Sequence, residues 1–188
     1  GKIIKKIADD GSTMVFPSPL TGSPTAYQDS VGTVATEGFV LDADGVLWRI
    51  DLTDTNPRKD EPLAGWTVRP FHDVFWDGGP SEGETTYERP ILSLDSRRRL
   101  VILLGTGDTD NFEKPTVKNR IVSLTEMFMT SPPTRPADYA AALNWEHKVD
   151  GGNGFVDSEL VTGTMALFDG QLFAASFIAA TILPGGSE

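Results

Sequence analysis

Short runs of alternating apolar and polar residues, separated by turn residues, recur along this chain. The sharpest example is VLDADGVLWRIDL, Val40 to Leu52, in which apolar runs flank Asp42 to Gly45. Asp and Gly favour tight turns, and glycine can take the positive φ that a hairpin turn requires. The stretch therefore predicts a β-hairpin whose second strand alternates between two faces. The residues expected on these faces are Trp48, Ile50 and Leu52 on one, and Leu47, Arg49 and Asp51 on the other.

Two later stretches, SLDSRRRLVILLGT and ALFDGQLFAASF, repeat the order of apolar pair, acidic turn and apolar run. They predict two more hairpins, around Asp95 to Arg99 and across Asp169 to Gln171. The expected strand pairs are Pro90 to Leu94 with Leu100 to Gly105, and Val161 to Phe168 with Leu172 to Phe177. Because Leu100 to Leu104 is apolar throughout, we expect that strand to be covered on both faces.

Period-2 runs elsewhere predict further strands, with Gly and Pro marking the loops between them. These strands are expected at Lys2 to Ile7, Trp66 to Val74, Arg120 to Leu124 and Leu143 to Val149. Phe16 to Asp29 holds three prolines, which cannot donate ladder hydrogen bonds, so it is expected to bridge or edge a sheet. One short helix is expected at Pro136 to Leu143, where an aspartate and several alanines follow a proline.

The composition, with 39% hydrophobic residues, 19 glycines and 13 prolines, is typical of a turn-rich all-β protein. Hairpins that recur at intervals predict the blades of a β-propeller, with a β-sandwich as the alternative. Three or four blades do not close a ring of the usual size, so the prediction is a partial β-propeller completed by parts of a longer chain. Residues 1–188 would be a segment of one propeller domain, and the lack of an initiator Met agrees with a processed chain or a segment.

Charge and cysteine content narrow the possible partners. The formal net charge of −11 argues against nucleic acid or an anionic membrane surface as the main partner, and leaves a basic partner open. The absence of cysteine excludes disulfides and cysteine-based chemistry. No apolar run reaches the roughly 18–20 residues of a membrane span, so none is predicted.

Two acidic stretches are candidate calcium sites. Asp42-Ala43-Asp44 offers two carboxylates, whereas calcium takes about six to eight oxygens, so the hairpin turn is the favoured interpretation there. Asp108 to Glu113, directly after Gly105-Thr106-Gly107, is richer in oxygen side chains, but Gly-Asp-Asn loops after strands are common without a metal. Neither His72 nor His147 has a second ligand at the spacing of a zinc helix.

Evidence for catalysis is thin. There is no Gly-x-Ser-x-Gly elbow and no phosphate-binding loop of the Walker type, and Gly105-Thr106-Gly107 lacks the third glycine of a dinucleotide site. No catalytic, cofactor-binding or metal-binding residue is therefore assigned. Arg97 to Arg99 lies at a predicted hairpin tip. A solvated cap is the favoured interpretation of these arginines, and a docking site is the alternative. The tryptophans are expected to pack in the core rather than form a ligand cage. They are Trp48, Trp66, Trp76 and Trp145.

The segment GFVLDADGVLWRIDL resembles one in the C-terminal β-propeller of the PilC/PilY family of type IV pilus assembly and tip proteins. Its most specific part is Leu47 to Leu52. The order of the surrounding pieces is also similar: GKIIKKI, then ILSLDSRRRLVILLGTGD with NRIVSLTEM, LNWEHKV, and SELVTGTMALFDGQLFAASFIAA. The resemblance covers nearly the whole chain.

This resemblance implies a non-catalytic protein outside the cell, at the pilus tip or outer surface of a bacterium, that supports pilus extension and touches surfaces or host cells. Its partners would be pilin or minor pilins and the rest of the parent polypeptide. Many relatives carry a calcium loop just before the Leu-Trp-Arg segment, but Asp29 to Glu37 here retains only two carboxylates, at Asp29 and Glu37. No cofactor is therefore expected. The alternative is a propeller dehydrogenase that binds pyrroloquinoline quinone and calcium.

Overall fold

The computed structural model describes residues 16–53, 66–76, 85–110, 119–128, 139–148 and 159–178. Every regular element in these ranges is a β-strand, which confirms the all-β prediction. The first four strands are β1 (Thr25–Tyr27), β2 (Glu37–Leu41), β3 (Val46–Asp51) and β4 (Thr67–Asp73). The next four are β5 (Ile91–Leu94), β6 (Leu100–Gly105), β7 (Arg120–Phe128) and β8 (Tyr139–Lys148). The last four are β9 (Glu159–Val161), β10 (Ala166–Phe168), β11 (Gln171–Phe173) and β12 (Ser176–Ile178).

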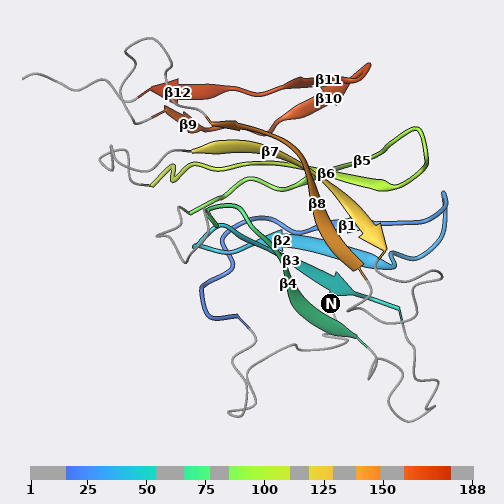
Figure 1. Cartoon of the computed structure of the whole chain (residues 1–188). Helices are drawn as coiled ribbons and strands as arrows, with labels where there is room; N and C mark the ends of the chain where they lie inside the picture. The colour runs from blue at the N-terminus through green and yellow to red at the C-terminus, as the bar shows by residue number, and fades with distance from the viewer. Residues whose placement is uncertain are drawn as a thin grey trace, which may run out of the picture.

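The strands form three stacked layers (Figure 1). The first layer is a four-stranded sheet in the order β1-β2-β3-β4, and the second is a four-stranded sheet in the order β5-β6-β7-β8. Neighbouring strands in both are antiparallel. β1 lies against β5 and β4 against β8, so the two sheets run in the same order. The third layer is a ribbon in which β9 pairs with β12 and β10 with β11.

The main hydrophobic core lies between the two four-stranded sheets. Register places Phe39 opposite Arg49 and Leu41 opposite Leu47, so these residues share the face of β2 and β3 that meets the second sheet. Apolar residues from both sheets fill this core: Phe39, Leu41, Leu47, Val74, Phe75, Leu100, Ile102, Leu104, Val122 and Leu124. A smaller cluster of Val161, Met165 and Leu172 joins the ribbon to Ile91 and Ile121 on the far face of the second sheet.

The predicted hairpins are confirmed at all three acidic turns. β2 pairs with β3, β5 with β6, and β10 with β11. The third hairpin is interrupted, because its outer ends pair separately as β9 and β12. The predicted strand at 66–74 is confirmed as β4, and the covered strand at 100–104 as part of β6, in which Val101 is half-buried and the other residues are buried.

The predicted helix at 136–143 is wrong. Its described part, from Tyr139 onward, belongs to the ten-residue strand β8, which pairs with β7 along nearly its whole length. About two turns of helix are marginal in isolation, so a long ladder of interstrand hydrogen bonds decides the conformation. The predicted strand at 2–7 lies outside the described residues. In the described part of the chain, no helix is long and apolar enough for a membrane span.

Candidate functional site

The guanidinium of Arg49 holds a cluster of carboxylates between the two four-stranded sheets. Its Nη2 lies 3.1 Å from Oε1 of Glu37 on β2, and its Nη1 lies 3.3 Å from Oδ2 of Asp51 on β3. Its Nε lies 2.8 Å from Oε1 of Glu126 on β7, in the other sheet. Arg49 is 1% exposed, so the planar fork is fixed in a desolvated position where a lysine could not make the same set of contacts.

The cluster contains more acid than base, and this affects its protonation. Burial, and then the negative charge of Glu126, raise the pKa of the Glu37 carboxyl to about 7, although Arg49 opposes the shift. Burial also raises the pKa of Glu126, again against the influence of Arg49. The second oxygen of Glu37, Oε2, is buried and has no hydrogen-bond partner among the described residues. Glu37 therefore changes charge close to neutral pH.

A pocket of about 210 Å³ opens over this cluster, at the end of the sheets where β1 leads into β2. Tyr27, Asp29 and Thr36 line one side, and Arg98, Arg99 and Phe128 belong to the other sheet; Glu37 and Glu126 are also in its lining. A shallower groove of about 420 Å³ continues from it and shares Tyr27, Asp29 and Arg98 with it. The pocket is thus bounded by both sheets.

The Asp42 turn is a hairpin turn in which this chain's own donors occupy the Asp42 carboxylate. Oδ1 of Asp42 accepts hydrogen bonds from the backbone N–H groups of Asp44, at 3.0 Å, and Val46, at 2.9 Å. Oδ2 accepts one from Nε1 of Trp48 at 2.8 Å. Gly45 takes a φ of 78°, as the turn preferences predicted. Both oxygens of Asp42 are occupied by this chain, so the turn interpretation fits the geometry.

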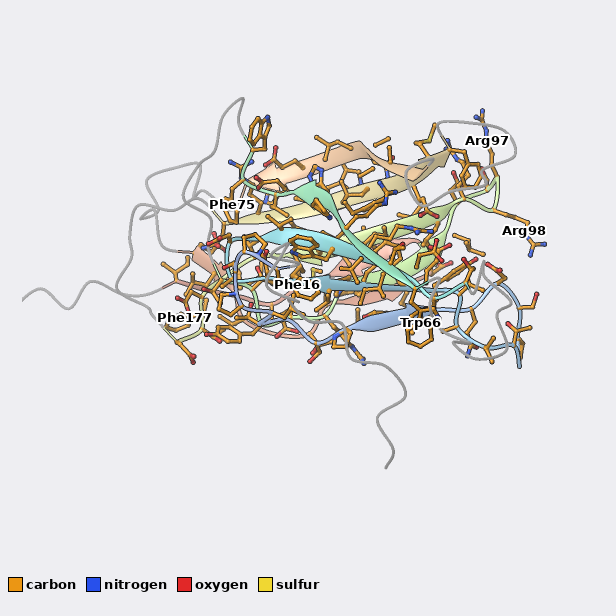
Figure 2. All side chains as sticks on the ribbon, turned by 90° about the horizontal axis from the view of Figure 1, so that it is seen from below. Phe16, Trp66, Phe75, Arg97, Arg98 and Phe177 are labelled. Carbon is orange, nitrogen blue, oxygen red and sulfur yellow. The ribbon has the colours of Figure 1, made fainter. Side chains whose placement is uncertain are left out.

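Asp95 organises the β5–β6 turn in the same way. Its Oδ1 accepts from the backbone N–H groups of Arg97 and Arg99, each at 2.8 Å, and its Oδ2 lies 2.7 Å from Nη2 of Arg99. The N–H of Arg99 and its guanidinium hold the pKa of Asp95 below its usual range. Arg98 adopts a φ of 62°. Figure 2 shows Arg97 and Arg98 extending outward from this turn, at the opposite end of the molecule from Phe177.

In the degenerate loop at 29–37, the two remaining carboxylates lie in different surroundings. Glu37 is bound to Arg49 inside the molecule, whereas Asp29 is exposed at the pocket. Val31, between them, has a side chain without any atom that could bind calcium. In the second loop, Oδ1 of Asp108 accepts from the N–H of Asp110 at 2.9 Å, and Oδ2 of Asp110 accepts from the Tyr87 hydroxyl. Residues 111–113 lie outside the described residues, within which no metal-binding group of three or more His, Cys, Asp or Glu is found.

Gly105-Thr106-Gly107 lies where the second sheet packs closely against the ribbon. A Cβ on Gly105 would lie 2.9 Å from Cγ1 of Val161, and one on Gly107 would lie 2.8 Å from the Val161 carbonyl oxygen. Thr106 is buried, donates to Oδ1 of Asn119 and accepts from the N–H of Arg120. The two glycines therefore allow β9 to approach β6 closely. This close packing explains why glycine stands at both positions, and no bound nucleotide is needed to explain it.

The prediction that the tryptophans pack in the core is confirmed for Trp48. This residue is buried and packs edge-to-face against Phe16, with 5.0 Å between the ring centroids. It is wrong for Trp76 and Trp145, which are both exposed; Trp145 lies on the edge strand β8. Trp66 is half-buried. His72 is half-buried and burial lowers its pKa, whereas His147 is exposed.

Arg49 lies in Leu47 to Leu52, the segment in which the family resemblance is most specific. The contact between Arg49 and Glu126 was not predicted from the sequence. The two residues are 77 positions apart, and only the stacking of the sheets brings them together. A weak signal was present, because Glu126 continues the alternation of Val122 and Leu124 on a buried face. No family model, curated protein or solved structure matches the chain. The resemblance to the PilC/PilY family therefore stays a prediction.

Proposed function

We propose that this chain is part of a β-propeller from a surface-exposed type IV pilus assembly or tip protein, which acts through binding rather than catalysis. The observation that carries the proposal is the stacking of two four-stranded antiparallel sheets in the same strand order, with β1 beside β5 and β4 beside β8. Neighbouring propeller blades have this relation, because each chain segment crosses from the outer strand of one blade to the inner strand of the next.

The third layer favours blades over a two-layer sandwich. A sandwich buries one face of each sheet, whereas the second sheet here packs on both. Leu104 and Leu124 meet the first sheet, while Ile91 and Ile121 meet the ribbon. Under this proposal, the ribbon is the start of a further blade, and other parts of a longer polypeptide complete the ring.

The proposed activity follows the family resemblance at Leu47 to Leu52. This segment supplies Leu47 to the core and Arg49 to the carboxylate cluster, so its residues join the two sheets. The protein would cap or prime the pilus and support its extension by binding pilin or minor pilins. It would act outside the cell, at the pilus tip or the outer surface, and touch host or abiotic surfaces.

A deletion experiment tests this proposal in the bacterium that encodes the chain. We expect in-frame removal of the gene to reduce the number of surface pili and twitching motility, and the wild-type gene to restore both. A gene carrying Arg49→Met should restore neither fully, whereas the exposed-turn control Arg97→Met should restore both. Normal piliation in the deletion strain would overturn the proposal. Quinone-dependent dye reduction by the purified protein would support the dehydrogenase instead.

A further inference from the structure

We propose that the Arg49 cluster is a pH-sensitive switch that opens one end of the interface between the two four-stranded sheets as the pH rises. The cluster consists of the guanidinium of Arg49 and the carboxylates of Glu37, Asp51 and Glu126. Glu37 and Asp51 belong to the first sheet and Glu126 to the second, so the charge of the cluster acts directly on the contact between the sheets. The inference does not depend on the proposed function.

β7 contacts the first sheet through polar groups near both of its ends, and the two contacts differ in chemistry. Near the end of the strand, Glu126 accepts a hydrogen bond from Nε of Arg49 at 2.8 Å. At its first residue, Nη1 of Arg120 donates to the carbonyl oxygen of Val74 at 2.9 Å, and the guanidinium lies 5.3 Å from the centre of the Phe75 ring. Positions 120 and 126 are about 20 Å apart along an extended strand. Of these two contacts, the one at Glu126 has a carboxylate as its acceptor, so pH acts on the two ends differently.

Full ionisation of the cluster puts surplus negative charge in a desolvated place. Glu37, Asp51 and Glu126 are 8%, 6% and 4% exposed. Arg49 contacts all three carboxylates, and Arg69 on β4 is a second cation that acts on Glu126. Three carboxylates thus face two cations. Buried carboxylates that share a site oppose one another's ionisation, so the closed interface favours a cluster that keeps one proton.

Glu37 is the member of the cluster whose ionisation favours separation of the sheets. Its Oε1 contacts Arg49, but its Oε2 is buried and has no hydrogen-bond partner among the described residues. A buried charged oxygen without a donor is strongly disfavoured, whereas water satisfies it. Because Oε2 is out of reach of solvent in the closed form, water hydrates it only when this end of the interface opens. The adjoining pocket of about 210 Å³, which both sheets bound, is the path for that water.

The protonation of Glu37 places the change near neutral pH. Burial, and then the charge of Glu126, raise its pKa from the ordinary 4.5 to about 7. The closed form therefore binds this proton more tightly than an open form in which Glu37 regains its ordinary pKa, and raising the pH favours opening. Between pH 6 and pH 8 the ratio of open to closed form should rise about tenfold.

The charged and titratable groups around Glu37 come from several elements. Those that act on its pKa are Glu126 on β7, Arg49 and Asp51 on β3, and Asp29 in the loop before β2. Tyr27 on β1 and Arg98 in the β5–β6 turn line the pocket with Asp29, and Arg99 in the same lining pairs with Asp95. Arg49 opposes the rise in the pKa of Glu37, so the raised value already includes the effect of its nearest cation.

Thiol labelling tests the proposal, because the chain has no cysteine of its own. Leu100→Cys places a thiol in the pocket lining at the cluster end, and Leu104→Cys places one opposite Val122, nearer to Arg120; both leucines are buried. Each full-length variant reacts with a disulfide reagent at pH 6 and pH 8 in increasing urea. Rates are corrected for the thiolate fraction with the same chain unfolded in urea.

We expect Leu100→Cys to react about tenfold faster than Leu104→Cys at pH 8, and about tenfold more slowly at pH 6 than at pH 8. Its rate should depend little on urea, because opening at one end exposes little surface, whereas the rate of Leu104→Cys should follow global unfolding. Equal rates with the same urea dependence in the two variants would show that only global unfolding occurs, and the proposal would be wrong.

Second substitutions assign the effect to Glu37. Glu37→Gln cannot ionise, so labelling of Leu100→Cys should no longer depend on pH. The matched control is Glu146→Gln, which changes a carboxylate 2.8 Å from Arg120 at the other end of β7 and should leave the pH dependence intact. A dependence that persists in Glu37→Gln, or that is lost in Glu146→Gln, would overturn the proposal.

A measurement on the wild-type chain covers the case in which Leu100→Cys does not fold. A neutral, soluble nitroxide accelerates the relaxation of methyl groups that it can approach, and methyl NMR compares Leu100 with Leu104 at the two pH values. The effect on Leu100 should increase from pH 6 to pH 8, while that on Leu104 should not. The same response in both leucines would contradict opening at one end.

Discussion

Arg49 is the residue on which the joint between the two sheets depends most. Its guanidinium contacts Glu37, Asp51 and Glu126, all three of which are buried. A buried ion cluster is not in itself strong evidence of stability, because desolvation opposes the attraction between the charges. Removing Arg49 is different, because three carboxylates then stay buried without the guanidinium that contacts all of them.

Arg49→Met should therefore lower the free energy of unfolding by about 3–5 kcal/mol. Arg49→Lys should recover part of the loss, since an ammonium lacks the fork that reaches three carboxylates. The measurement is chemical denaturation at pH 7, with Arg97→Met as the matched control at an exposed position, where a change within about 0.5 kcal/mol is expected. A loss below about 1 kcal/mol for Arg49→Met would show that water reaches the carboxylates.

Glu37 should make the folded state less stable as the pH rises. Its pKa in the folded chain is about 7, above the ordinary value of 4.5, so the folded state binds this proton more tightly than the unfolded state. The associated stability is fully present below about pH 4.5 and is lost as the pH rises to about 7. Between pH 5 and pH 8, Glu37 should lower the free energy of unfolding by about 2–3 kcal/mol.

Denaturation of the wild type and Glu37→Gln at both pH values measures this contribution. The difference between the two pH values should be smaller in the variant by that amount. Burial raises the pKa of Glu126 and Asp42 as well, so both proteins keep a residual dependence of the same sign. An identical pH dependence in the two proteins would mean that Glu37 is ionised throughout the range.

At the scale of elements, the close approach of β9 to β6 depends on two glycines. Gly107→Ala would place a Cβ 2.8 Å from the Val161 carbonyl oxygen and 2.9 Å from its nitrogen, so backbone has to move. We expect a loss of about 1–3 kcal/mol, as for other overpacked sites. The control Gly163→Ala meets only Ala175, at an ordinary 3.7 Å, and should change stability far less. Thermal or chemical denaturation measures the loss of stability in each variant. Equal losses in Gly107→Ala and Gly163→Ala would show that the ribbon does not approach the second sheet as closely as described.

Strands with a local signal could be predicted from the sequence. The hairpin at Asp42 to Gly45 follows from turn chemistry, because an Asp accepts two backbone N–H groups and a Gly takes positive φ. The three acidic turns do not occupy equivalent places, however. They join β2 to β3, β5 to β6, and β10 to β11, so their spacing does not measure the length of a repeat.

Features that depend on distant partners could not be predicted. The alanine run in β8 has a local preference for helix, but its pairing with β7 decides the structure. The pocket requires Asp29 from one sheet and Phe128 from the other, and no local pattern relates these residues. The exposure of Trp145 follows from the position of β8 at a sheet edge, which the residue type does not reveal.

For the whole molecule, calcium should have little effect on stability. Both oxygens of Asp42 and Oε1 of Glu37 are held by this chain's own donors, and the described residues contain no group of three or more His, Cys, Asp or Glu, whereas calcium takes about six to eight ligands. Chelation with EDTA should therefore leave the melting temperature nearly unchanged. A bound ion at a hundredfold excess over its Kd would instead add roughly 2.7 kcal/mol.

Two variants locate any calcium effect that does occur. Asp29→Ala and Asp108→Ala should each melt at the same temperature with and without calcium. A calcium-dependent shift abolished only by Asp29→Ala would show that the loop at 29–37 still binds the ion. One abolished only by Asp108→Ala would assign it to the loop that follows Gly107, whose last residues lie outside the described part of the chain.

We propose that the two four-stranded sheets are neighbouring blades of one propeller. The most direct measurement is an experimental structure, by cryo-electron microscopy or crystallography, of the full polypeptide that carries this chain. We predict β1 and β5 beside a central axis, β4 and β8 at the rim, and further sheets that continue past the ribbon until the ring closes. A structure in which the two sheets form a two-layer sandwich, with no further sheets arranged around an axis, would contradict the account.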